Sequence, residues 1–184
     1  MSEPSPYAFV VNGVTFYDPH PGRQVEVLRV LRDRICGEGP VGWAPAEQRP
    51  EDSPAGEYSA TNLFLRGNRG SGKSRLVRSF LHGCAVALAG FRYVVVRRNM
   101  PDLRKNHLIY VGPEMRKLGG DFNETYGMAR YENGSIGFYC QCEDEKDAEK
   151  IVGAEAAVIF VDEAPQIKWE LLRLIAPSLR VAKV

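Results

Sequence analysis

Apolar and polar positions repeat along the chain with two periods, one typical of helices and the other of strands. Residues 23–35 (RQVEVLRVLRDRI) gather apolar side chains on one helical face and charged ones elsewhere, which predicts an amphipathic helix. A second helical pattern runs from Lys73 to about Ala89, and Gly90 is placed to end it. Three further helical segments are predicted: one helix or two short ones within 100–120, an acidic helix within 143–153, and a final helix from Lys168 to about Ile175.

Short apolar runs between these segments predict strands. The run 91–99 (FRYVVVRRN) is rich in β-branched residues, as is typical of a buried strand. Residues 128–140 (MARYENGSIGFYC) predict a hairpin, because the dipeptide Asn133-Gly134 favours a tight turn. Two more strands are predicted, one around 62–65 and one within 156–167 (AAVIFVDEAPQI).

Strands that alternate with helices favour an α/β fold, here with a mainly parallel central sheet flanked by helices. The 184 residues are enough for a single domain, 1–184, with its own core. Residues 1–22 predict an extended lead-in, and residues 37–57, with four Gly and four Pro, predict a long loop.

The overall charge excludes a uniformly basic surface as the basis of function. The chain has 24 Lys and Arg and 23 Asp and Glu, so its net charge is close to zero, and any contact with nucleic acid depends on a local basic patch. No apolar run approaches the roughly 20 residues that cross a bilayer, and the start MSEPSPYAFV lacks the pattern of a signal peptide. The cysteines are expected to be buried or half-buried thiols rather than metal ligands: Cys36, Cys84, Cys140 and Cys142.

The strongest chemical signal is a glycine-rich turn between a predicted strand and a predicted helix. Residues 67–74 (GNRGSGKS) fit the phosphate-binding pattern G-x-x-x-x-G-K-[ST]. Glycine allows a tight curve whose N–H groups point at phosphate, and the helix start adds a positive dipole end. We expect Lys73 to reach the β- and γ-phosphates of ATP and Ser74 to ligate Mg²⁺. The residues expected to line the nucleotide are Gly67, Asn68, Arg69, Gly70, Ser71, Gly72, Lys73, Ser74 and Arg75.

Two carboxylates at the end of the last apolar run supply a second part of the same chemistry. Asp162 is expected to hold Mg²⁺ through water, and Glu163 to polarise a water for attack on the γ-phosphate. This adjacent pair favours ATP hydrolysis over phosphoryl transfer to a small molecule. It also suggests an additional strand between the strand before the turn and the Asp-Glu strand, for which 91–99 is the candidate.

These segments, in this order, resemble the ATPase domain of the large terminase subunit of tailed bacteriophages. The resemblance lies in GNRGSGKS, VVVRRNMPDLRKN and the run YENGSIGFYCQCEDEKDAEKIVGAEAAVIFVDEA, and it covers roughly residues 15–180. It implies a P-loop NTPase of the ASCE type that uses ATP hydrolysis to drive double-stranded DNA into a procapsid in the host cytoplasm. The implied partners are DNA, the portal protein, a small terminase subunit and further copies of the chain in a ring.

The resemblance also adds roles for residues outside the core motifs. Arg69 matches an arginine that senses or stabilises the γ-phosphate, with an exposed loop charge as the alternative. Gln24 matches an element that contacts the adenine, and the alternative is a solvated glutamine at a helix start. Four basic residues are expected either to touch DNA or a neighbouring subunit's nucleotide, or to form a solvated strand end and helix face: Arg97, Arg98, Arg104 and Lys105.

The chain departs from the family pattern near its end. A coupling strand with Ser or Thr is expected just beyond Leu179, whereas the sequence ends at Val184 and no RNase H-like nuclease domain follows. We therefore expect an excised, truncated or split version of the protein and carry over no nuclease activity. Two other functions stay open: a helicase- or recombinase-like ATPase with the same phosphate chemistry, and a nucleotide-binding fragment that does not hydrolyse.

Overall fold

The computed structural model describes residues 9–11, 14–17, 24–25, 28–29 and 71–179. The chain divides into two compact units, Met1–Gly83 and Cys84–Val184, and each is described by itself. The predicted loop at 37–57 and the predicted strand at 62–65 lie outside the described residues.

The first unit contains a short β-ribbon where the sequence predicts only an extended lead-in. Strand β1 (Phe9–Val11) pairs antiparallel with β2 (Val14–Tyr17). The dipeptide Asn12-Gly13 between the two strands is a hairpin signal that the sequence reasoning overlooked. The predicted helix at 23–35 is confirmed where it is described, since residues 24–25 and 28–29 are helical, with Leu28 buried and Arg29 exposed.

Helix α2 (Lys73–Ala87) begins at the predicted residue and ends two residues before the predicted one. Its predicted apolar stripe is buried at Leu76, Phe80 and Cys84. Gly90 follows with a φ of +73°, a left-handed conformation that glycine adopts without strain, and so ends the helical segment as predicted. The boundary between the two units falls within α2.

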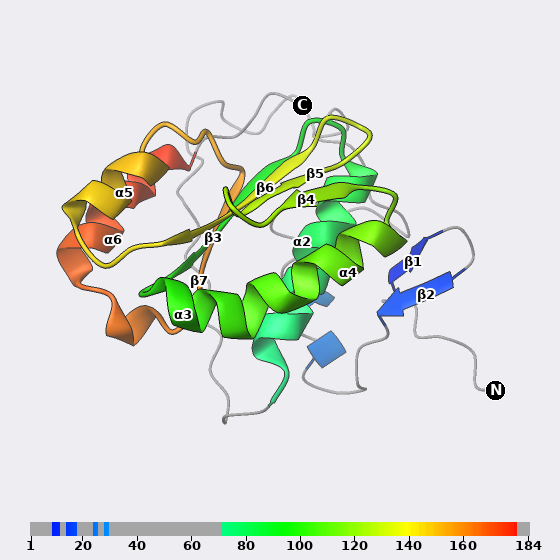
Figure 1. The fold of residues 1–184 in the computed structure, drawn as a ribbon, viewed down its shortest axis with the longest axis horizontal. Helices are drawn as coiled ribbons and strands as arrows, with labels where there is room; N and C mark the ends of the chain where they lie inside the picture. The colour runs from blue at the N-terminus through cyan, green and yellow to red at the C-terminus, as the bar shows by residue number, and fades with distance from the viewer. Residues whose placement is uncertain (1–8, 12–13, 18–23, 26–27, 30–70, 180–184) are drawn as a thin grey trace, which may run out of the picture. The chain divides into compact units, whose positions relative to one another are not determined.

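The second unit is built on a five-stranded mixed sheet of order β4-β5-β6-β3-β7 (Figure 1). The strands are β3 (Arg92–Arg97), β4 (Asp121–Asn123), β5 (Met128–Arg130), β6 (Ile136–Gln141) and β7 (Val158–Val161). Strand β3 runs parallel to β6 and β7, whereas β5 runs antiparallel to β4 and β6. The predicted α/β class is confirmed, but the sheet described is mixed rather than mainly parallel, because the predicted hairpin and the unpredicted strand β4 extend it.

The neighbours of β3 correct one prediction. Both edges of β3 are paired, one with β6 and the other with β7. Since a strand has only two edges, β3 cannot lie directly between β7 and the predicted strand at 62–65. The segment 91–99 is therefore the neighbour of the Asp-Glu strand and has β6 on its other edge.

Helices cover both faces of this sheet (Figure 1). On one face, α3 (Met100–Leu103), the π-helical turn η2 (Arg104–Leu108) and α4 (Ile109–Lys117) follow each other directly, so the predicted segment 100–120 is one interrupted helix. On the other face, α5 (Glu145–Ile151) and α6 (Trp169–Ile175) lie side by side. Two short 3-10 helices follow β7 and α6, namely η3 (Ala164–Gln166) and η4 (Ala176–Ser178).

The alternation of β3 side chains divides the core between these two faces. Val94 and Val96 pack in one cluster with residues of α5 and α6, among them Ile151 and Leu171. Tyr93 points to the opposite face, where its hydroxyl lies 2.9 Å from that of Tyr131 and 3.2 Å from that of Tyr139. Burial raises the pKa of Tyr93 and of Tyr131 well above the ordinary value, so the cluster is neutral and hydrogen-bonded.

Within the described residues, no helix is both long and apolar enough to span a membrane.

The Asn133-Gly134-Ser135 turn of the hairpin has a second role at the end of α2. The Asn133 side-chain amide donates to the carbonyls of Ala85 and Val86 at 2.8 and 3.1 Å. The Ser135 hydroxyl donates to the carbonyl of Leu88 at 2.8 Å. Because the last carbonyls of a helix have no partner within it, this turn satisfies the C-terminus of α2 as well as reversing the chain.

The cysteines of the second unit are thiols, as predicted. Cys84, Cys140 and Cys142 form no disulfide among the described residues, and Cys36 lies outside them. Burial raises the pKa of the Cys140 thiol to about 12 and also raises that of Cys142. Both side chains therefore stay protonated at neutral pH and act as small apolar groups.

We expect Gly137→Ala to destabilise the fold by about 1–3 kcal/mol, the usual cost of overpacking a core. A Cβ at Gly137 would overlap Cζ and Oη of Tyr93, whose ring is held by the two tyrosine hydrogen bonds and is fully buried. The free energy of unfolding, measured by urea denaturation, checks this prediction.

Gly112→Ala is the matched control for that substitution. Gly112 lies within α4, and a Cβ there would meet nothing closer than 3.7 Å. Alanine is the better helix former, so this variant is expected to be unchanged or more stable by up to about 1 kcal/mol. Equal stability of the two variants would contradict the packing described for Tyr93.

Candidate active site

The second half of the glycine-rich turn has the backbone that its sequence predicts. Gly72 has a φ of +78°, in the left-handed region, and its carbonyl accepts the N–H of Leu76 at 2.9 Å. Lys73 and Ser74 are thereby the first two residues of α2, and both are half-buried. The other turn residues lie outside the described part of the chain: Gly67, Asn68, Arg69 and Gly70.

The side chain of Lys73 folds back onto the turn that precedes it. Lys73 Nζ donates to Ser71 Oγ at 3.2 Å, so the ammonium group lies over the loop rather than along the helix. Arg75, the third residue of the helix, is exposed. Together with the N–H groups of the first helical turn, the Lys73 ammonium makes this junction suitable for a phosphate group.

Gln24 lies against the same turn, although 47 positions separate it from Ser71. Its Nε2 donates to the Ser71 carbonyl at 3.2 Å. A Cβ at Gly72 would lie 3.3 Å from that nitrogen, a tight contact to the end of a flexible side chain. The structure thus brings Gln24 to the predicted phosphate loop, and its contact with adenine stays a prediction.

A second group of predicted site residues, within the second unit, lies at the carboxyl ends of β3 and β7. Val96 and Val161 are paired in register, and the Asp162 N–H donates to the Val96 carbonyl at 2.9 Å. Arg97 and Asp162 follow this pair directly, and Arg97 Nη1 donates to Asp162 Oδ2 at 2.5 Å. Both side chains are about nine-tenths buried, at 11% and 9% exposed. In parallel sheets the carboxyl ends of the strands are where ligands bind, which suits a metal-binding carboxylate.

His107 completes this cluster and was missed in the sequence. Its Nε2 lies 3.0 Å from Asp162 Oδ2, and the ring is fully buried. It comes from the π-helical turn η2, and nothing in the spacing of three scattered histidines marks it. Among the described residues, Arg97 Nε and His107 Nδ1 have no hydrogen-bond partner.

Glu163 is held in a conformation that few residues other than glycine adopt. Its φ and ψ are 56° and 45°, and its carbonyl accepts the N–H of Gln166 at 2.9 Å at the start of η3. Such a backbone costs about 1–3 kcal/mol and is found mainly where surrounding structure or function requires it. The Glu163 side chain is exposed, so its carboxylate is accessible to water and substrate while Asp162 beside it is buried.

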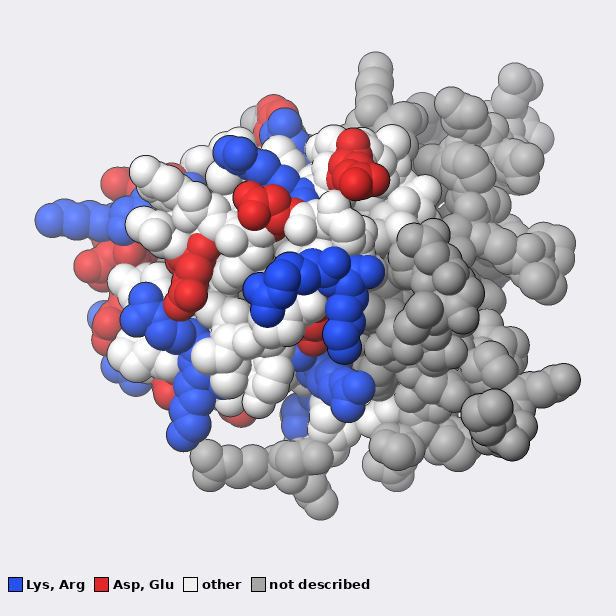
Figure 2. All heavy atoms as spheres, turned by 45° about the vertical axis from the view of Figure 1, so that its right-hand side comes forward, with Lys and Arg blue, Asp and Glu red and all other residues white. Residues whose placement is uncertain are grey.

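The predicted basic group divides into buried and solvated members. Arg97 was predicted to contact DNA or a nucleotide, or to be a solvated strand end, but it is buried against Asp162. Arg98 and Arg104 lie 3.8 and 3.5 Å from Glu143 and Glu124, in ion pairs that are half exposed or more. Exposed pairs of this kind contribute little to stability, and Figure 2 shows basic and acidic side chains next to each other on one face.

Lys105, the fourth basic residue, is exposed on η2. Its role stays a prediction.

Ser74 and Asp162 are the two residues predicted to ligate Mg²⁺. Magnesium keeps much of its water and binds through one or two protein oxygens together with phosphates, and a serine hydroxyl and an aspartate carboxylate are each oxygen ligands of this kind. Within the described residues, no group of three or more His, Cys, Asp and Glu is arranged to hold a metal on its own. Ser74 belongs to the first unit and Asp162 to the second.

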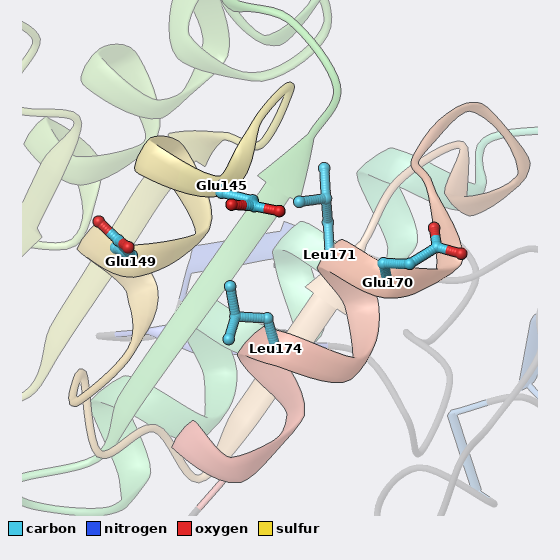
Figure 3. Close-up of a pocket in the computed structure, with 5 residues that line it drawn as sticks. All are labelled: Glu145, Glu149, Glu170, Leu171 and Leu174. Carbon is cyan, nitrogen blue, oxygen red and sulfur yellow. The ribbon is translucent and has the colours of Figure 1, made fainter.

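A separate hollow of about 360 Å³ lies between α5 and α6 (Figure 3). It is lined by Glu145, Glu149, Glu170, Leu171 and Leu174, none of which is a predicted site residue. Leu171, Leu174 and Glu145 face the space between the two helices. Three carboxylates repel an anionic ligand, so this hollow is not suited to a nucleotide.

Comparisons with known proteins identify no family for this chain. No family model, curated protein or solved structure matches this chain.

Proposed function

We propose that this chain is a P-loop ATPase and the motor domain of a viral DNA-packaging terminase. The observation that carries the ATPase part is the left-handed Gly72 followed at once by the helix that starts at Lys73, within the motif GNRGSGKS. This geometry presents N–H groups, an ammonium group and a hydroxyl at one point, which is what a triphosphate requires.

The roles of the residues follow from their chemistry. Lys73 binds the β- and γ-phosphates, and Ser74 and Asp162 hold Mg²⁺, which neutralises phosphate charge when bound. Glu163 accepts a proton from the attacking water, because an exposed carboxylate beside the metal ligand is accessible to that water. Arg69 stabilises the charge on the γ-phosphate, and Gln24, close to the loop, contacts the base.

The packaging part of the proposal is supported by the order of segments beyond the phosphate loop. The strand ending in Arg97-Arg98, the Asn-Gly-Ser hairpin, the acidic helix α5 and the Asp-Glu strand end follow each other as in the terminase pattern. The substrate of translocation is then double-stranded DNA, and the partners are the portal protein, the small terminase subunit and copies of this chain in a ring.

ATP turnover by the full chain, with and without double-stranded DNA, tests the proposal. We expect weak Mg²⁺-dependent hydrolysis that DNA stimulates, because a neighbouring subunit in the proposed ring contributes to full activity. EDTA is the control, and hydrolysis that survives it would contradict the metal role. Vigorous turnover by a monomer without DNA would argue against a packaging motor, and binding to portal protein separates a motor from a helicase.

A further inference from the structure

We propose that His107 is a positioning residue, whose Nε2–H holds the Asp162 carboxylate in the orientation that binds Mg²⁺. This inference rests on the proposed function, in which Asp162 is a metal ligand. It assigns a role to a buried histidine that no motif of the sequence identifies.

One ring nitrogen of the buried His107, Nε2, has Asp162 as its hydrogen-bond partner. The ring is 0% exposed and lies near two aromatic rings, with centroid distances of 6.3 Å to Tyr139 and 6.3 Å to Phe160. A carboxylate only accepts hydrogen bonds, so Nε2 donates the bond to Asp162 Oδ2. Nδ1 has no hydrogen-bond partner among the described residues. In the neutral ring Nδ1 then carries a lone pair and not an unpaired N–H, which is the less costly arrangement.

The helix that carries His107 departs from regular geometry at that residue. Residues 104–108 form a π-helical turn, and the N–H of Ile109 donates to the carbonyl of Arg104, five residues back. Such a turn adds one residue relative to an α-helix and changes which side chains face the sheet, and it often occurs at functional sites. Pro113, one turn further along α4, removes a regular helical hydrogen bond to Ile109.

Two donors on the same oxygen define the orientation of Asp162 better than one. Arg97 and His107 approach Oδ2 from β3 and η2, two separate elements of the same unit. Partners of this kind fix metal ligands, and their loss typically reduces metal affinity or activity by about 10- to 100-fold. Arg97 also places a positive charge beside the buried Asp162 carboxylate.

His107→Phe tests this role with a readout other than catalysis. The phenyl ring keeps the aromatic packing and removes the donor. The measurement is the affinity of the full chain for a fluorescent ATP analogue, with Mg²⁺ and with EDTA. We expect the increase in analogue affinity caused by Mg²⁺ to be about 10-fold smaller in this variant than in the wild type, with the affinity in EDTA unchanged. An unchanged Mg²⁺ effect in a variant with wild-type unfolding temperature would overturn the proposal.

Two amide variants form a matched pair if the phenyl ring disturbs folding. The glutamine of His107→Gln places its NH₂ near the position of Nε2, whereas the shorter asparagine of His107→Asn does not reach it. We expect Gln to retain most of the Mg²⁺ effect and Asn to lose it. Equal Mg²⁺ effects in both variants would count against a positioning role.

A measurement on the wild type needs no variant to fold. Nitrogen-15 NMR of labelled histidine is expected to show His107 with a proton on Nε2, and a neutral ring protonated on Nδ1 would overturn the proposal.

The wild-type titration separates the two hypotheses. Failure of the wild type to bind the ATP analogue removes the proposed function, and this inference falls with it. If the wild type binds the analogue and His107→Phe shows the same increase in affinity with Mg²⁺, the inference about His107 fails and the proposed function stands.

Discussion

Glu163→Gln is expected to bind ATP like the wild type and to hydrolyse it about 10²- to 10⁴-fold more slowly, the usual contribution of a general base. The amide has the size and shape of the carboxylate but cannot accept the proton of the attacking water. Glutamine makes similar demands on the backbone, so the left-handed conformation at this position is retained. Phosphate release at saturating ATP measures the rate, and a fluorescent analogue measures binding.

Glu155→Gln is the control for this substitution. Glu155 is also exposed and also has a positive φ, 48° against 56° for Glu163, but it precedes β7 whereas Glu163 follows it. Its replacement is expected to leave turnover unchanged, because the proposed site residues lie at the other, carboxyl end of the strand. Normal turnover in Glu163→Gln would assign the base to another residue.

Lys73→Ala is expected to weaken ATP binding by about 10- to 100-fold and to remove measurable turnover. A hydrogen bond from a charged group contributes about 1.5–3 kcal/mol, which corresponds to this range of affinity. The ammonium group lies over the turn, 3.2 Å from Ser71 Oγ, where a bound phosphate would compete for it. Binding titrations and turnover assays with the full chain provide the two measurements.

Lys117→Ala removes the same charge from an exposed position in the last turn of α4 and serves as the control. Both lysine variants are expected to unfold at the wild-type temperature, since exposed or half-buried lysines contribute little to stability. Unchanged hydrolysis in Lys73→Ala would remove the P-loop assignment.

Local elements were predictable because their signals lie within a few residues. The start of α2 at Lys73 follows from the glycine-rich turn, and the end of the helical segment follows from Gly90, a residue type that readily adopts the positive φ found there. The hairpin follows from Asn133-Gly134, and the position of Asp162 and Glu163 follows from an apolar run that stops at Val161. None of these depends on distant parts of the chain.

Pairing between distant segments was not predictable in the same way. Strand β4 (Asp121–Asn123) is only three residues long and lacks a clear alternation, and it forms because Phe122 and its neighbours pair with β5. Strand β3 pairs with β6 along one edge and with β7 along the other. The composition of a single strand does not specify which strands will pair with it. The burial of Arg97 likewise depends on the carboxylate that β7 places beside it.

By itself the sequence predicted the candidate chemistry of this protein: a turn proposed to bind phosphate, a carboxylate proposed to bind metal and an adjacent carboxylate proposed as a base, each recognised by residue type and short spacing. Only the tertiary structure decided which residues meet that carboxylate. Arg97 and His107 lie 65 and 55 positions from Asp162, and they reach it through parallel strand register and a π-helical turn. Register and helical phase depend on the packing of the whole unit, because a shift of one residue moves a side chain to another face.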